Sequence, residues 1–413
     1  MSRHDNAAVL SVIIPTYNRA ALLARTLDSL NCQHSPVPFE VIVSDDGSTD
    51  DTRAIVSRYA EQLALTYHFQ PDLGFRASAA RNAGAALASA PLLCFLDAGT
   101  FAGPSFVASH HASHRVANDV ATIGYIHGYQ PFKEQPHVSE LITTLGPSAA
   151  GNLMARQSWA TDMRHPTFAA AGWAIDTLIA PWSLFFSANI SLSAESFWRV
   201  GGFDEDFTSW GAEDIELGYR LHRAGTTFTV SRDSWSVELP HRRTTDANVA
   251  SHNRNMEIFL RKHPHPHVEL FAATGPNRVN DACARVLDWQ HAVTGFDVRR
   301  ELDAVDGLAS AESVVVIGSG TDLPGYLTAA SAIDFDAAVV AALSQRRSVP
   351  TLHSLGLHTG LPDRCVTDVV LTTRVLGLWT EWERELVREA RRIGRRVRYT
   401  FDTINRSDPL ATA

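Results

Sequence analysis

The chain has 413 residues, a formal net charge of −9, and 45% hydrophobic and 20% charged residues. This length exceeds what one hydrophobic core usually serves, so two domains are expected. The composition excludes extensive disorder, and the negative charge argues against a protein that holds nucleic-acid phosphates through lysine and arginine. A nucleotide ligand is still allowed, because one small anion needs only a local positive site.

The spacing of the cysteines and the absence of long apolar segments indicate the cellular compartment in which the protein is expected. Cys32, Cys94, Cys283 and Cys365 show no CxxC or Cys-His spacing, which predicts free thiols in a reducing environment. The N-terminus runs straight into a strand pattern without signal-peptide features, and no window approaches the roughly 20 apolar residues that a membrane span needs. We therefore expect a cytoplasmic protein without a transmembrane segment.

Short apolar runs alternate with helical patterns near the N-terminus, which is typical of βαβ units and of a parallel sheet. Strands are predicted at 9–15, 39–44, 65–69 and 92–96, and helices at 20–30, 52–63 and 78–88. In such sheets ligands bind beyond the carboxyl ends of the strands. Those ends carry Pro15-Thr16-Tyr17, Asp45-Asp46 and Asp97.

The rest of the chain is less regular. Residues 104–180 contain loops rich in Gly and Pro, and long loops of this kind often cover a site. The later predictions are a strand at 185–193, helices from Ser193 and Trp210, short strands at 226–230 and 234–239, and a helical linker at 264–300. A second α/β unit is predicted from strands at 313–317, 368–372 and 396–401 and a helix at 379–393.

The tract Gly318-Ser319-Gly320 follows the strand at 313–317 and could cradle a phosphate. However, Leu323 stands where the third glycine of GxGxxG belongs, and no acidic residue ends an obvious second strand about 20 residues on. A plain strand-to-helix turn is therefore favoured. We expect this C-terminal unit to contribute to acceptor binding or oligomerisation.

Acidic residues at the strand ends suggest a nucleotide site. The carboxylates of Asp45 and Asp46 could accept hydrogen bonds from a base or ribose, with Pro15 and Thr16 shaping the wall of the base pocket. The alternative is helix capping, because Asp45, Asp46 and Ser48 precede a predicted helix.

A cation on the next helix could serve the same ligand. Arg81 and Asn82 lie among alanines, where an exposed cation has no obvious structural partner. The planar guanidinium of arginine suits a diphosphate, and the alternative is a surface salt bridge. Asp97 then ends a strand, where a divalent cation or a ribose could meet it.

Two adjacent acids, Glu213 and Asp214, open a later helix whose macrodipole stabilises their ionised forms. A carboxylate beside the anomeric carbon of a sugar could deprotonate an incoming hydroxyl or thiol. The simpler interpretation is the ordinary preference for acids at a helix N-terminus. Trp210-Gly211 fits a ring that stacks on a sugar face, although a Trp in a core is commoner, and His241 could be a neutral imidazole ligand to Mn or Mg.

Six segments in this order resemble family 2 glycosyltransferases: SVIIPTYNR, VSDDGSTDDT, GFRASAARNAG, FLDAG, GGFDEDFTSWGAEDIELGYRLHRAG and LPH. Over residues 9–245 the chain is similar to bacterial polymerase-type members, and to related galactosyl- and N-acetylgalactosaminyltransferases with a W-G-x-E-D segment. The resemblance implies a GT-A fold, with a Rossmann-like mixed sheet flanked by helices. The catalytic domain is expected at 1–263, and a smaller Rossmann-like α/β domain at 301–413.

The resemblance also implies residue roles. Asp214 would be the general base of an inverting transfer by direct displacement, and Glu213 would bind an acceptor or donor hydroxyl. Asp97 would be the first acid of a DxD motif and, with His241, a metal ligand. The residues expected to bind the nucleotide sugar are Pro15, Thr16, Tyr17, Arg19, Asp45, Asp46, Arg76, Arg81 and Asp97.

One departure from the family pattern concerns the metal. The second acid of the DxD motif commonly binds the metal, and here that position is Gly99. Asp97 and His241 remain as candidate ligands for Mn or Mg, and diphosphate oxygens and water could complete the shell. The alternative is metal-free catalysis, in which Arg76 or Arg81 neutralises the leaving UDP.

The expected activity is inverting transfer of a sugar from a UDP-linked donor to a soluble acceptor, either a small molecule such as a natural product, a peptide or a glycan. A homodimer is compatible with the sequence.

One alternative is a catalytically silent GT-A protein that binds a nucleotide sugar or a partner glycosyltransferase. Gly99 favours this alternative, and the intact segment 210–216 speaks against it. A sugar nucleotidyltransferase would need a glycine-rich basic loop after the first strand, where Pro15-Thr16-Tyr17-Asn18 stands.

Overall fold

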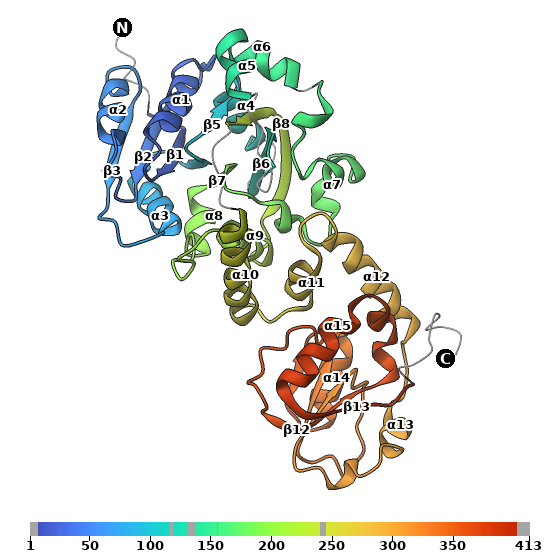
Figure 1. Ribbon diagram of the computed structural model, residues 1–413. Helices are drawn as coiled ribbons and strands as arrows, with labels where there is room; N and C mark the ends of the chain where they lie inside the picture. Colours follow the sequence, from blue (N-terminus) through green and yellow to red (C-terminus); the bar gives the residue numbers. More distant parts are fainter. Residues whose placement is uncertain (1–6, 116–118, 131–137, 155, 240–244, 403–413) are drawn as a thin grey trace. The chain divides into compact units, whose positions relative to one another are not determined.

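The computed structural model describes residues 7–115, 119–130, 138–154, 156–239 and 245–402 (Figure 1). The chain divides into two compact units, one up to Ile258 and one from Phe259 onward. Each unit has its own sheet. In the part of the chain that the structure describes, no helix is long and apolar enough to cross a membrane.

The first unit is built on a mixed sheet of eight strands in the order β3-β2-β1-β4-β7-β6-β8-β5. The first four strands run parallel, β7 is antiparallel to β4 and to β6, β8 is parallel to β6, and β5 is antiparallel to β8. The strands are β1 (Leu10–Thr16), β2 (Phe39–Asp45), β3 (Leu65–Phe69), β4 (Leu92–Leu96), β5 (Thr100–Ala102), β6 (Val120–His127), β7 (Asn189–Ser193) and β8 (Thr227–Glu238).

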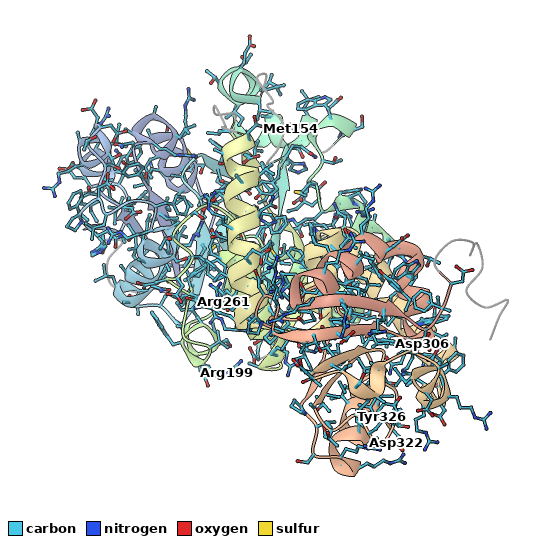
Figure 2. The ribbon with its side chains drawn as sticks, turned by 60° about the horizontal axis from the view of Figure 1, so that its bottom comes forward. Met154, Arg199, Arg261, Asp306, Asp322 and Tyr326 are labelled. Carbon is cyan, nitrogen blue, oxygen red and sulfur yellow. The ribbon has the colours of Figure 1, made fainter. Side chains whose placement is uncertain are left out.

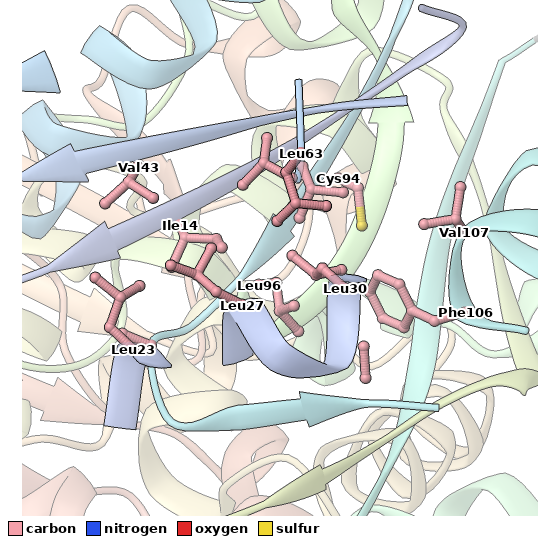
Figure 3. Packing of buried hydrophobic residues seen from close by; sticks show 14 of the residues in the cluster. Ile14, Leu23, Leu27, Leu30, Val43, Leu63, Cys94, Leu96, Phe106 and Val107 are labelled. Carbon is pink, nitrogen blue, oxygen red and sulfur yellow. The ribbon is translucent and has the colours of Figure 1, made fainter. Parts of the chain in front are cut away.

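Helices cover both faces of the parallel part of this sheet, which is why its strands are continuous apolar runs. On one face Ile14 packs with Leu23 and Leu27 of α1, in the core cluster drawn in Figure 3. On the other face α3 lies so close that a Cβ on Gly84 would come within 2.6 Å of Ile13. The helices of this first half are α1 (Ala20–Asn31), α2 (Thr52–Tyr59), α3 (Ala77–Leu87) and α4 (Phe106–Ser113).

The second half of the first unit departs from the predicted elements. The two short strands expected at 226–230 and 234–239 form one strand of twelve residues, β8, because its pairing with β6 continues across a register shift between Gly124 and Ile126. The strand expected at 185–193 begins only at Asn189. The helices here are α5 (Val138–Leu145), α6 (Pro147–Met154), α7 (His165–Ala170), α8 (Ala194–Arg199) and α9 (Glu213–Arg223), and α10 (Thr245–Lys262) contains the boundary between the units.

The second unit contains a five-stranded parallel sheet in the order β11-β10-β9-β12-β13. This unit includes the stretch 264–300, which is helical. The strands are β9 (Val314–Ile317), β10 (Ala330–Asp334), β11 (Thr351–His353), β12 (Val366–Leu371) and β13 (Gly394–Tyr399). The helices are α11 (Pro266–Thr274), α12 (Val279–Ala292), α13 (Arg299–Asp303), α14 (Ala337–Arg346) and α15 (Leu376–Ile393).

The expectation that no acidic residue ends a second strand after the glycine tract is wrong. Strand β10 ends at Asp334 beside β9, and its small residues Ala-Ser-Ala hid it from the apolar pattern. Asp334 is fully buried and accepts hydrogen bonds from the backbone N–H of Gly320 (3.0 Å) and from Arg374 Nε (2.9 Å). The acid therefore ties the glycine turn to the sheet. The expected strand-to-helix turn is wrong in one respect, because the tract leads through irregular turns to strand β10 and not to a helix.

Candidate active site

The strand ends that carry the predicted nucleotide residues meet at one edge of the first sheet. Thr16 at the end of β1 lies beside Asp45 at the end of β2, and Ile13 of β1 lies beside Phe95 of β4, so that Asp97 follows at the same edge. The parallel pairing that the apolar runs predicted thus brings residues from three separate segments together.

Asp45 closes the turn that follows β2. It is 1% exposed, and its two carboxylate oxygens accept hydrogen bonds from the Tyr67 hydroxyl (2.7 Å) and from the backbone N–H of Ser48 (2.8 Å). These contacts fix the shape of the loop between β2 and α2. These contacts give Asp45 a role in the fold, and its expected contact with the nucleotide stays a prediction.

Asp46 anchors the loop that leads into α3. Its carboxylate accepts hydrogen bonds from Gln70 Nε2 (2.6 Å), from the backbone N–H of Arg76 (2.8 Å) and from Arg76 Nη2 (3.1 Å). A carboxylate can accept about four hydrogen bonds, so Asp46 keeps acceptor capacity for a ligand. Since Arg76 immediately precedes α3, this contact also sets where that helix begins.

The last two residues of β1 and the residues that follow it lie at the same edge of the sheet. Pro15 is half-buried, Tyr17 is 45% exposed and donates a hydrogen bond from its hydroxyl to Asp72 (2.8 Å), and Arg19 lies exposed at the start of α1. The buried Oγ1 of Thr16 has no hydrogen-bond partner among the residues that the structure describes. A buried polar group without a partner costs about 1–3 kcal/mol, so Thr16 is a candidate ligand contact.

Arg81 connects Asp97, which follows β4, to the acid pair Glu213-Asp214 at the start of α9. Its side chain is buried, with Nη2 at 3.0 Å from Asp97 Oδ1 and Nη1 at 3.0 Å from Glu213 Oε1, and its guanidinium lies 5.2 Å from the ring centre of Phe203. The expectation of an exposed cation without a structural partner is therefore wrong. The partners lie 16 and 132 residues away in sequence, so no local pattern could reveal them.

A tight turn presents the acid pair. Gly211 has φ +98° and Ala212 has φ +72°, and a Cβ on Gly211 would lie 3.0 Å from His252 Nδ1. Positive φ is uncommon for a residue with a side chain, so Ala212 holds a strained conformation directly before Glu213. The ring of Trp210 is half-buried and lies 6.4 Å from that of His252.

Asp214 is held by backbone N–H groups. Its Oδ2 accepts from the N–H of Ser187 (3.0 Å), and its Oδ1 accepts from the N–H of Ile215 (2.8 Å). Desolvation and the negative charge of Glu213 raise the pKa of Asp214 above its usual range, although the Ser187 N–H and Arg81 oppose the change. A carboxylate whose pKa is raised toward neutral pH is a better proton acceptor.

Two residues that support this site carry no role in the sequence prediction. Ser187 positions Asp214, and it precedes β7 in a segment without a motif. Asn82 donates to the carbonyl of Phe203 (2.9 Å) and accepts from its N–H (2.9 Å), which fixes the segment that leads into the α9 turn. Asn82 stands next to Arg81 in the GFRASAARNAG segment, and this adjacency was the only local signal.

The described residues do not by themselves form a metal site. His241 lies outside the described residues, and Asp97 pairs with Arg81. Gly99 has φ +101°, and a Cβ there would meet the side chain of Leu22 at 3.5 Å, so an acid at this position would be strained and would point at an apolar group. Within the described ranges, no group of three or more His, Cys, Asp or Glu residues could hold a metal ion.

The mixed sheet of the first unit, with parallel strands in its first half, is the fold of a GT-A glycosyltransferase. Residues 11–171 match the model of glycosyl transferase family 2, and residues 174–248 match that of the N-terminal domain of galactosyltransferase. The chain belongs to glycosyl transferase family 2 and is a glycosyltransferase.

The relatives differ in how much of the chain they match. Validoxylamine A glucosyltransferase of Streptomyces hygroscopicus subsp. jinggangensis is 44% identical over 410 residues, which is 95% of this chain and 97% of the relative. Chondroitin synthase of Escherichia coli is 33% identical over 269 residues, 62% of this chain and 38% of that protein. Among solved structures, S. aureus TarS 1-349 aligns with a TM-score of 0.43 at 17% identity, covering 73% of this chain and 74% of that one.

Proposed function

We propose that this chain transfers a glucosyl group from UDP-glucose to a hydroxyl group of a small natural product related to validoxylamine A, with inversion at the anomeric carbon. The 44% identity to validoxylamine A glucosyltransferases over 95% of the chain supports this choice of sugar and acceptor. The residue arrangement that carries the proposal is the acid pair Glu213-Asp214, linked through Arg81 to Asp97 at the nucleotide edge.

The donor would lie along the ends of β1, β2 and β4. Asp46 has acceptor capacity for the base or ribose, and Thr16 Oγ1 and Arg76 Nε are buried without hydrogen-bond partners in the described part of the chain. Arg76 lies beside Asp46 and Arg81 beside Asp97, so cationic groups stand along the line that a diphosphate would follow. They would stabilise the negative charge that develops on the leaving UDP.

The acceptor would react beside Asp214. In the proposed step, Asp214 removes the proton of the acceptor hydroxyl while its oxygen attacks the anomeric carbon from the side opposite UDP. The bond between the anomeric carbon and the diphosphate oxygen breaks, UDP leaves with the electron pair, and the proton remains on Asp214. Glu213, whose Oε2 is buried and has no partner among the described residues, would hold a sugar hydroxyl.

Turnover with defined substrates tests this proposal. The protein is incubated with UDP-glucose and validoxylamine A, and the product is analysed by mass and by the anomeric coupling constant in proton NMR. Since the sugar of UDP-glucose is α-linked, inversion should give a β-glucoside. GDP-glucose serves as the control donor and should support little or no transfer.

Each part of the proposal can fail separately. An α-linked product would contradict inversion, and transfer from GDP-glucose at an equal rate would contradict a site for UDP. If calorimetry detects UDP-glucose binding but no transfer to validoxylamine A occurs, the acceptor is wrong. The absence of binding by any UDP-sugar would remove the donor assignment.

A further inference from the structure

We propose that a pocket beside β6 and β8 in the first unit binds the part of the acceptor that lies beyond the reacting hydroxyl. We propose also that this pocket recognises a polyhydroxylated ring. This inference rests on the proposed function, because it concerns the acceptor of the same transfer. The pocket has a volume of about 550 Å³, which lies within the range of small-molecule sites. Its walls include Tyr125, His127, Trp173, Arg232 and Trp235, and Met154 at the end of α6 (Figure 2).

The strand register places this pocket at the same edge of the sheet as the candidate active site. Ile190 of β7 pairs with Phe95 of β4 on one side and with Ile123 of β6 on the other. Both β4 and β6 run antiparallel to β7, so Ile123 lies level with Phe95, two strands away, and Tyr125 and Asp97 each follow two residues later toward the same edge. Two interstrand spacings are about 10 Å, a distance that an acceptor of two linked rings can span.

The pocket lies on the side of β7 that faces away from the proposed nucleotide residues, where the acceptor would bind. The proposed nucleotide residues follow β1, β2 and β4, whereas the pocket lies beside β6 and β8, on the other side of β7. Ser187, which holds Asp214, lies two residues before β7 and thus stands between the two sites. A molecule that reacts beside Asp214 and extends away from the nucleotide would therefore reach toward Tyr125.

The lining has the chemistry that recognises a polyol ring. The ring centres of Tyr125 and His127 are 4.9 Å apart, those of His127 and Trp235 are 5.8 Å apart, and the guanidinium of Arg232 lies 4.4 Å from the ring centre of Trp173. Aromatic faces pack against the C–H groups of a sugar or cyclitol ring. Imidazole and guanidinium groups at the same wall can bond to its hydroxyl groups.

Positive φ angles and closely packed glycines accompany the two tryptophans of the pocket, Trp173 and Trp235. Trp173 has φ +68°, directly after Gly172 with φ +57°, and such a conformation is an outlier for a bulky side chain. A Cβ on Gly103 would lie 2.6 Å from the indole of Trp235, and a Cβ on Gly151 would lie 2.1 Å from it. Local strain of this kind often accompanies ligand-binding positions, and here it occurs at a residue that lines the pocket.

Two pocket variants test the inference through the acceptor kinetics. Arg232→Ala and Trp173→Ala should each raise the KM for validoxylamine A about tenfold, the effect of losing one good contact of about 1.4 kcal/mol, with kcat and the Kd for UDP-glucose within about twofold of wild type. Trp173→Phe keeps an aromatic face and should retain most of the affinity. Arg58→Ala, at an exposed position on α2, is the matched control.

The outcomes separate this inference from the proposed function. If wild type transfers glucose to validoxylamine A and both variants keep its KM, the pocket inference is wrong and the proposed function stands. If wild type transfers nothing, binding of validoxylamine A alone is measured by calorimetry: binding that weakens in Arg232→Ala supports the pocket, while no binding, or equal binding by all variants, overturns it. Thermal unfolding of each variant verifies that a loss does not reflect misfolding.

Discussion

Each unit has an edge at which the carboxyl ends of its parallel strands meet. The two edges differ in how completely their charged and polar side chains are paired. In the second unit Asp334, at the end of β10, is fully buried and bonds to Arg374 and Gly320. This acid has both a basic partner and an N–H partner within the unit. A strand end with this arrangement is closed and stabilises the fold.

The corresponding edge of the first unit is incompletely satisfied. Arg81 is shared by Asp97 and Glu213, and Asp214 adds a further acid beside them. Among the described residues, the buried atoms Thr16 Oγ1, Arg81 Nε and Glu213 Oε2 have no hydrogen-bond partner. The same topological position therefore serves folding in one unit and is available for a ligand in the other.

The largest expected effect is the loss of the base. Asp214→Asn preserves shape but cannot accept a proton, so kcat should fall by about 10²- to 10⁴-fold. The Kd for UDP-glucose should stay within about twofold, because the proposal assigns Asp214 to the acceptor and not to the nucleotide. Steady-state kinetics and calorimetry provide the two measurements, with Glu61→Gln at an exposed position as the control. Full turnover by Asp214→Asn would show that the base is a different residue.

The second unit should respond in stability rather than in donor binding. Asp334→Ala leaves the buried guanidinium of Arg374 without its principal partner, and breaking such a pair costs about 3–5 kcal/mol. Denaturant unfolding should show this loss, while the Kd for UDP-glucose is retained under native conditions. Asp97→Ala is the comparison, since its side chain is 40% exposed and should cost much less stability. Equal losses in the two variants would contradict the distinction between the edges.

The pH dependence of activity should report the charge of Glu213. In the proposed transfer Asp214 is the base and has to be deprotonated, so kcat/KM should rise with pH through its raised pKa. Glu213→Gln removes a negative charge that contributes to that raised pKa, and the acid limb of the profile should therefore move to lower pH. Glu61→Gln should leave the limb in place. A limb that stays unchanged in Glu213→Gln would mean that Asp214 does not titrate under the influence of Glu213.

The smallest effect concerns the altered DxD position. Gly99→Asp should not create or strengthen metal dependence, because φ is +101° and the side chain would meet Leu22. Calorimetry with UDP-glucose, with and without Mn, gives the comparison with wild type. The expected change in Kd is less than about threefold, and Gly99→Ala separates the backbone strain from the added charge. A large Mn-dependent gain by Gly99→Asp alone would show that the loop can adapt to a metal.

The sequence by itself determined the family, the GT-A fold, the alternation of the first four strands and the residues at their ends. These properties are local: apolar runs set the strands, and the ordered motifs occupy the loops that follow them. For the same reason the helix at Glu213 could be predicted, since adjacent acids favour a helix N-terminus.

Only the tertiary structure decided the pairings. The contacts of Arg81 with Asp97 and Glu213, and of Ser187 with Asp214, join segments that are 16, 132 and 27 residues apart. Burial determines how strong such contacts are, and burial follows from the strand order rather than from spacing. Strand β10 and its terminal Asp334 were missed because small residues in a buried strand give no apolar signal. The pocket beside β6 likewise depends on register, which the sequence does not specify.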